Sequence, residues 1–120
     1  MLRELHTELG IPDDYGSDGV KPAFEEAVDL VEVGPNPDGR MQRLTSATAA
    51  SWQAMQAAAQ GDGVALLLIS GFRSVEYQAS LIRRKLDAGQ SVSEILNVSA
   101  APGFSEHHTG RAIDIQNFAN

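Results

Sequence analysis

Apolar and polar positions are arranged along this chain in patterns that predict strands and helices. In residues 27–33, apolar and charged residues alternate with the period of a half-buried strand. The turn-rich sequence GPNPDGR follows, so Met41–Leu44 is predicted to return as the second strand of a hairpin. The continuous apolar run Val64–Ser70 predicts a central strand buried on both faces, and residues 112–115 predict a last strand.

Other segments have the apolar spacing or the alanine content of helices. Leucines recur at helical spacing in residues 2–9, whereas residues 11–22 are rich in Gly, Asp and Pro and predict a loop. An alanine-rich helix is predicted from a cap at Thr45 or Ser46 to about Gln60. Its predicted core stripe consists of Trp52, Met55 and Ala59.

Two further helices are predicted to begin at serine caps. Ser74 caps a helix that ends at Gly89, and Ser91 and Glu94 have the spacing of a capping box that opens a short third helix. Helices and strands in this order predict an α+β fold. A length of 120 residues predicts a single domain, residues 1–120.

Composition and charge narrow the class of protein. A net charge of -7 argues against a nucleic-acid partner, and the basic run at residues 83–85 is predicted to be a solvated helix face. The absence of cysteine excludes disulfides and Cys-based zinc sites. The start of the chain has no apolar leader, and the longest apolar run is too short to span a membrane. We therefore expect a soluble, cytoplasmic chain, or a periplasmic or cell-wall-associated one if a leader was removed.

The sequence SEHHTGRAID, residues 105–114, concentrates the candidate chemistry. Histidine and carboxylate are the usual zinc ligands when cysteine is absent, and Gly110 permits the turn that would let His107 and Asp114 converge. The alternative is a loop histidine and a strand aspartate that faces water. His108 is adjacent to His107 and is expected to point elsewhere.

A second polar group follows the apolar strand in SGFRS, residues 70–74. Strand ends that lead into helices often carry functional side chains, and the planar fork of Arg73 suits a carboxylate. The alternative is a structural salt bridge from Arg73 to Glu76 or Asp87.

These two segments together resemble the VanY-like D-alanyl-D-alanine carboxypeptidases. Those zinc peptidases trim peptidoglycan stem peptides and are related to the D-Ala-D-Ala dipeptidases. The resemblance extends more loosely from the hairpin near Val31 to the end, so residues 27–120 are the family-like region and residues 1–26 an N-terminal helix and loop. SGFRSVEYQ matches the upstream family element, and the fixed positions of S-x-H-x-x-G-x-A-x-D are matched by Ser105, His107, Gly110, Ala112 and Asp114.

The resemblance implies a fold, a cofactor and residue roles. It implies a small antiparallel sheet flanked by helices, as in the hedgehog signalling domain, and a substrate peptide ending in D-Ala-D-Ala. His107 and Asp114 would be two of three ligands to Zn²⁺. Arg73 would contact the substrate carbonyl or carboxylate and stabilise the oxyanion, and Gln78 and Ser105 would hydrogen-bond the peptide end.

The match breaks after Ile115. The family pattern continues to an E-x-W-H type segment that supplies a general base and the third zinc ligand, but QNFAN contains neither residue. A general base is typically worth roughly 10²–10⁴-fold in rate. Nothing in the sequence recommends His6, Glu106 or His108 as substitutes.

Three hypotheses follow from this break. The chain is a zinc carboxypeptidase that lacks its C-terminal segment, a peptide-binding module without catalysis, or a half-site completed by another chain. The third hypothesis implies self-association through an exposed sheet edge.

Overall fold

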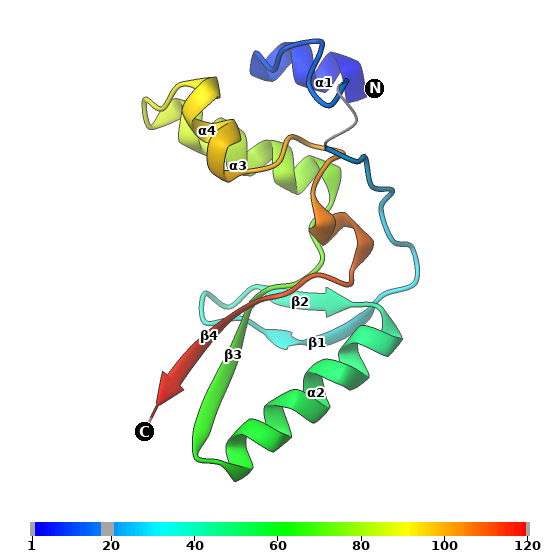
Figure 1. Ribbon diagram of the computed structural model, residues 1–120, viewed down its shortest axis with the longest axis vertical. Helices are drawn as coiled ribbons and strands as arrows, with labels where there is room; N and C mark the ends of the chain where they lie inside the picture. The colour runs from blue at the N-terminus through cyan, green and yellow to red at the C-terminus, as the bar shows by residue number, and fades with distance from the viewer. Residues whose placement is uncertain (1, 18–20, 120) are drawn as a thin grey trace. The chain divides into compact units, whose positions relative to one another are not determined.

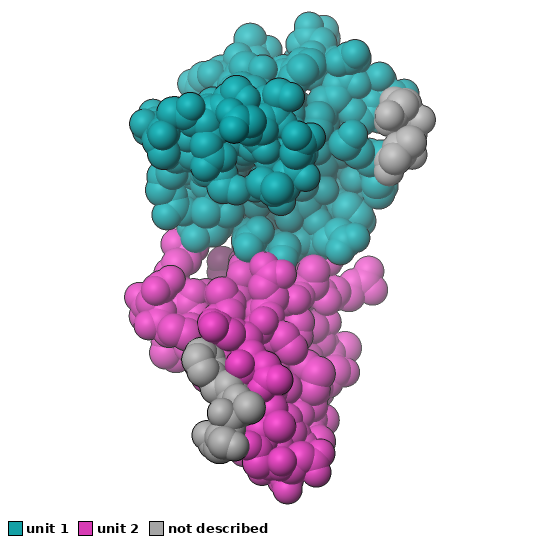
Figure 2. Space-filling view, turned by 60° about the vertical axis from the view of Figure 1, so that its left-hand side comes forward, with its two compact units in different colours: residues 1–26, 73–108 teal, residues 27–72, 109–120 magenta. Residues whose placement is uncertain are grey.

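The computed structural model describes residues 2–17 and 21–119, which form two compact units coloured separately in Figure 2. Unit 1 comprises residues 1–26 and 73–108, and unit 2 comprises residues 27–72 and 109–120. Unit 1 contains α1 (Leu2–Leu9), α3 (Val75–Asp87), α4 (Val92–Val98) and the 3₁₀ helix η1 (Glu106–Thr109). Unit 2 contains β1 (Val31–Pro35), β2 (Met41–Leu44), α2 (Ser46–Gly61), β3 (Val64–Ser70) and β4 (Asp114–Ala119).

Helices and two small antiparallel sheets confirm the predicted α+β class (Figure 1). One sheet pairs β1 with β2, and the other pairs β3 with β4. The single-domain organisation stays a prediction.

Caps at the predicted serines define the starts of α3 and α4 in unit 1. The Ser74 hydroxyl accepts the Tyr77 N–H at 2.9 Å and opens α3. Both bonds of the predicted capping box are present in α4: Ser91 Oγ accepts from the Glu94 N–H, and the Glu94 carboxylate accepts from the Ser91 N–H. Each pair satisfies backbone donors that a helix start leaves open.

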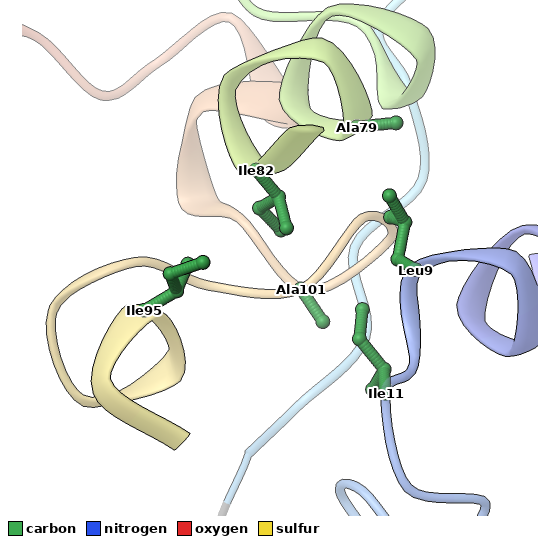
Figure 3. Packing of buried hydrophobic residues seen from close by; sticks show 6 residues of the cluster. All are labelled: Leu9, Ile11, Ala79, Ile82, Ile95 and Ala101. Atoms are coloured by element: carbon green, nitrogen blue, oxygen red, sulfur yellow. The ribbon is translucent and has the colours of Figure 1, made fainter. Parts of the chain in front are cut away.

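The core of unit 1 lies where α1, α3 and α4 meet the segment that follows α4 (Figure 3). Ile82 and Ile95 are completely buried, and full burial of such a side chain contributes about 1.5–3 kcal/mol. The buried cluster consists of Leu9, Ile11, Ala79, Ile82, Ile95 and Ala101.

The predicted hairpin is confirmed in unit 2, but its first strand begins later than predicted. β1 starts at Val31, and Val28 is 89% exposed. β2 has four residues and finds partners only between Val31 and Pro35, with an irregular register between Glu32 and Gly34. Residues 27–30, despite their alternating pattern, therefore have no partner in the β1–β2 ladder.

Helix α2 begins after Thr45, as predicted, but its buried stripe differs from the prediction. Trp52 is buried with Ala49, Leu44 and Leu68, whereas Met55 is 39% exposed. The face that meets the sheet therefore runs through positions 49 and 52, which are three residues apart, and turns Met55 towards solvent.

The prediction of a central strand at β3 was wrong. Among the described residues β3 pairs with β4 alone, and Leu67 is 37% exposed whereas its neighbour Leu68 is buried. β4 spans Asp114–Ala119, later than the predicted residues 112–115.

The predicted N-terminal helix and loop are confirmed where they are described. α1 spans Leu2–Leu9, and residues 11–17 and 21–22 form turns and loop; the remaining loop positions, 18–20, lie outside the described residues. Within the described ranges, every helix is too short or too polar to cross a membrane.

Candidate functional site

The hairpin holds the end of β3 in unit 2. Gln42 Oε1 accepts the Gly71 N–H at 2.8 Å, and the Arg43 carbonyl accepts the Phe72 N–H at 2.9 Å. A Cβ on Gly71 would lie 2.8 Å from the Arg43 carbonyl oxygen and 2.9 Å from Leu44 Cδ2. The close approach of two backbones therefore requires glycine within SGFRS.

An irregular register places Asp114 opposite the last residue of β3. Leu68 pairs with Ile115, and Ser70 pairs with Asp114, so Ile69 is an extra residue on β3. The Ile69 carbonyl accepts from Asn36 Nδ2 at 2.9 Å. Bulges of this kind re-aim side chains and are frequent beside active sites. The bulge sets which residue of β4 faces Ser70, the first residue of SGFRS.

Arg73 and Gln78 belong to unit 1, at the start of α3. The Glu26 carboxylate accepts the N–H of Val75 at 2.7 Å and so satisfies one more open donor at the helix start. Gln78 is 2% exposed, and its Nε2 donates to the Ala100 carbonyl at 2.8 Å. Gln78 Oε1 is buried without a hydrogen-bond partner among the described residues.

The segment that carries Ser105 is fixed by hydrogen bonds from other parts of unit 1. His6 Nε2 donates to the Pro102 carbonyl at 2.8 Å, because a carbonyl can only accept. The Phe24 N–H donates to the Gly103 carbonyl at 2.8 Å. Ser105 itself is 4% exposed. His6, which sequence reasoning did not favour as a zinc ligand, thus supports this segment.

His108 is fully buried, and both of its ring nitrogens are bonded. The Gly103 N–H donates to Nε2 at 3.0 Å, so Nε2 carries no proton. Nδ1 lies 2.7 Å from the Arg73 carbonyl, which only accepts, so Nδ1 carries the proton. A neutral imidazole with both nitrogens occupied has no lone pair left for a metal ion.

His107 lies on the same 3₁₀ helix and is partly exposed. Its N–H donates to Ser105 Oγ at 3.2 Å, and its carbonyl accepts the Arg73 N–H at 3.1 Å. Three of the predicted site residues, Arg73, Ser105 and His107, are therefore joined by hydrogen bonds within unit 1.

Gly110 makes the turn that the sequence predicted. Its φ is 69°, and its carbonyl accepts the Thr45 N–H at 3.0 Å. A Cβ at this position would lie 2.7 Å from Leu30 Cδ2. Both the left-handed backbone and the close contact therefore favour glycine between His107 and Asp114.

The two predicted zinc donors fall in different units. His107 belongs to unit 1 and the exposed Asp114 to unit 2, so each unit presents one donor. Imidazole and carboxylate are suitable zinc ligands. Within residues 2–17 and 21–119, no group of three or more His, Cys, Asp or Glu side chains is placed to hold a metal ion. The donor types fit zinc, whereas their number falls short of the three protein ligands usual in a catalytic site.

The specific role of His108 was missed by sequence reasoning. Adjacent histidines indicated only that one of the two would point elsewhere. Its partners, the backbones of Arg73 and Gly103, are visible only after folding because a side-chain bond to a backbone group leaves no residue pattern.

Comparison with known proteins identifies the family. A model of the VanY D-alanyl-D-alanine carboxypeptidases matches residues 41–120, so the chain belongs to that family, as the two motifs predicted. The family comprises hydrolases of peptidoglycan peptides. A search of curated proteins found no match.

Three solved structures resemble the chain. The LdcB LD-carboxypeptidase is 30% identical with a TM-score of 0.64, and covers 78% of this chain and 45% of its own. VanYB in complex with D-alanine-D-alanine is 25% identical with a TM-score of 0.61, covering 80% and 56%. A variant of the vancomycin-resistance D,D-pentapeptidase VanY in complex with Zn(II) is 27% identical with a TM-score of 0.57, covering 74% and 52%. The chain spans about half the length of these structures.

Proposed function

We propose that this chain is part of a zinc-dependent carboxypeptidase that removes the terminal D-Ala from peptidoglycan stem peptides ending in D-Ala-D-Ala. The observation that carries the proposal is the hydrogen-bonded set of Arg73, Ser105 and His107, which stand at the matched motif positions. The family match and the neighbours bound to Zn(II) and to D-alanine-D-alanine support it. The cell wall is the site of action that this substrate implies.

Arg73 is proposed to bind the reacting end of the peptide. A guanidinium presents several N–H donors in one plane and suits a carboxylate, or the oxyanion that develops when the carbonyl is attacked. The N–H and carbonyl of Arg73 are both held by η1, through His107 and His108. The side chain therefore starts from a fixed backbone, which lowers the cost of orienting it.

Gln78 and Ser105 are proposed to bind the peptide end. Gln78 keeps one buried acceptor, Oε1, without a partner among the described residues, and an N–H of a bound peptide would satisfy it. The Ser105 hydroxyl accepts from the His107 N–H and retains its own proton to donate.

His107 and Asp114 are proposed to hold Zn²⁺ together with a third donor from outside the described residues. A bound zinc ion polarises a carbonyl and lowers the pKa of water. Neither the third donor nor a general base is assigned to a residue of this chain.

Hydrolysis by the zinc-loaded, full-length protein tests the proposal. We expect release of D-Ala from a peptide ending in D-Ala-D-Ala, and a loss of roughly 10²–10³-fold in kcat/KM for Arg73→Ala, the range for removal of an oxyanion donor. Arg3→Ala, on the exposed face of α1, is the matched control and should retain full activity. A full-length protein with stoichiometric zinc and no hydrolysis would refute the enzymatic role.

A second candidate is a peptide-binding module without catalysis. The absence of a three-donor metal group among the described residues, together with the buried unpaired acceptor of Gln78, favours it. This candidate predicts that the 120-residue chain binds D-alanyl-D-alanine without zinc and that Arg73→Ala weakens binding. Titration calorimetry with and without zinc measures the binding of D-alanyl-D-alanine. Binding that requires zinc counts against this candidate.

A third candidate is a site completed by another chain. Among the described residues β3 and β4 pair only with each other, and Ile115 is 43% exposed. Open strand edges accept further strands. Sedimentation should then show a dimer that Ile115→Lys weakens; a monomer at all concentrations excludes this candidate.

A further inference from the structure

His108 binds two backbone segments of unit 1 that are distant in sequence. Its Nδ1–H donates to the Arg73 carbonyl at 2.7 Å, and its Nε2 accepts from the Gly103 N–H at 3.0 Å. The side chain is completely buried. Two well-placed bonds in a buried site are stronger than the same bonds in water, and each is costly to lose.

The residue held by this imidazole is the proposed substrate-binding arginine. The Arg73 N–H donates to the His107 carbonyl at 3.1 Å, while the Arg73 carbonyl accepts from His108. Consecutive residues of η1 therefore hold both backbone groups of Arg73. Because the positions of a residue's N and C=O fix the direction of its Cα–Cβ bond, the bond to His108 helps to fix where the guanidinium chain begins.

The chemistry of the two partners selects the side chain at position 108. One partner is an acceptor and the other a donor, so the bridging group must offer a donor at one end and an acceptor at the other. A neutral imidazole meets this need with a rigid ring. Glutamine offers the same pair of groups on a flexible chain, whereas leucine has a similar volume and offers neither.

We infer that His108 is a positioning residue that, as its Nδ1–H tautomer, sets the backbone of Arg73 against the turn that carries His107. The inference rests on the proposed function, because it acts through Arg73. It assigns His108 no contact with substrate or metal. Its consequence is that the order of the Arg73 side chain depends on the hydrogen bonds of His108 and not on its bulk.

The test compares His108→Leu with His108→Gln in the 120-residue chain by NMR. We expect the Arg73 Nε–H order parameter and the protection of the Arg73 and Gly103 amides to fall in His108→Leu and to recover in His108→Gln. D-alanyl-D-alanine, added as the probe, should bind His108→Leu roughly 10–100-fold more weakly, the range typical of residues that orient a site. His108→Gln should bind within about threefold of wild type, since it retains both hydrogen bonds.

Ser91→Ala is the control, since it removes a cap of α4 and should lower the melting temperature without changing the Arg73 order parameter or the dipeptide affinity. Unchanged Arg73 dynamics in His108→Leu would overturn the inference, as would equal effects of the leucine and glutamine variants. If His108→Leu does not fold, the tautomer of His108 in the wild-type chain is measured by NMR instead. A proton on Nε2 would contradict the inference. Wild-type chain that shows the predicted Arg73 dynamics but no dipeptide binding contradicts the proposed binding role alone.

Discussion

In unit 1, the segment that carries Ser105, His107 and His108 is hydrogen-bonded to α1, to the chain near Phe24 and to the backbone of Arg73. In unit 2, by contrast, Asp114 begins strand β4, whose partner in the described residues is β3 alone. The first arrangement fixes polar groups through several independent hydrogen bonds. The second depends on one ladder and on a bulge. The proposed peptide-binding residues are therefore preorganised inside one unit, whereas the proposed zinc donors are divided between two.

The largest effect is expected from the core of unit 1. Ile82→Ala should lower the free energy of unfolding by about 2–5 kcal/mol, because it empties a completely buried position. Trp52, the only tryptophan, lies in unit 2. Its fluorescence in a urea titration therefore shows whether the substitution in unit 1 also lowers the unfolding midpoint of unit 2. If residues 1–120 are one domain, the Trp52 transition should shift together with the circular dichroism.

Val98→Ala provides the control for that experiment. Val98 is 77% exposed, and its truncation should change stability by less than about 0.5 kcal/mol. A Trp52 transition that stays at its wild-type midpoint in Ile82→Ala would contradict the single-domain prediction.

The next effect concerns the donor in unit 2. Asp114→Ala should weaken Zn²⁺ binding to the chain by at least about tenfold, since even the supporting residues of a metal site cost that much. Competition with a chromogenic chelator measures the zinc affinity of each variant. Asp38→Ala, which removes an exposed carboxylate from the turn of the hairpin, should bind as wild type. Equal zinc affinity in all three proteins would remove Asp114 from the site.

A smaller effect is expected where the hairpin supports the bulge. Asn36→Ala should cost about 1–2 kcal/mol, because its side chain bonds the Ile69 carbonyl and accepts from the N–H groups of Asp38 and Arg40. Asn36→Asp keeps the acceptor and loses only the donor to Ile69, so it should cost less. Urea unfolding measures both variants, and an Asn36→Asp variant as stable as wild type would show that the bond to Ile69 adds nothing to stability.

The smallest effect is a pH dependence in unit 1. The Ser91 backbone N–H, followed by its side chain, lowers the pKa of Glu94 from 4.5. A lowered folded-state pKa stabilises the protein above the unfolded value, and this contribution is lost as the pH falls through the folded value. Wild type should therefore exceed Glu94→Gln in stability at pH 7, with the difference shrinking below about pH 4.5. A difference that stays constant from pH 7 to pH 3 would be the contrary result.

Local signals predicted the helices well. Ser74 and the pair Ser91 and Glu94 predicted helix starts because a cap bonds residues only three positions away. The motif spacing predicted the family, and Gly110 predicted a left-handed turn. The roles of Arg73 and Asp114 stay predictions.

Two predictions were wrong because contacts between distant segments decided the outcome. A continuous apolar run suits both a central and an edge strand, so it did not reveal that β3 pairs with β4 alone in the described residues. Met55 was predicted to be in the core because it lies on the apolar stripe of the helix. Helical periodicity identifies such a stripe, but it does not indicate which edge of the stripe packs against the sheet.

The family, the helix caps and the candidate zinc donors could be predicted from the sequence, since each depends on residues near one another in the chain. The pairing of Ser70 with Asp114 across a bulge and the bond from His108 to the backbone of Arg73 became visible only in the folded chain. These contacts join segments far apart in sequence, and at least one partner in each is a backbone group that every residue possesses, so no residue pattern predicts them.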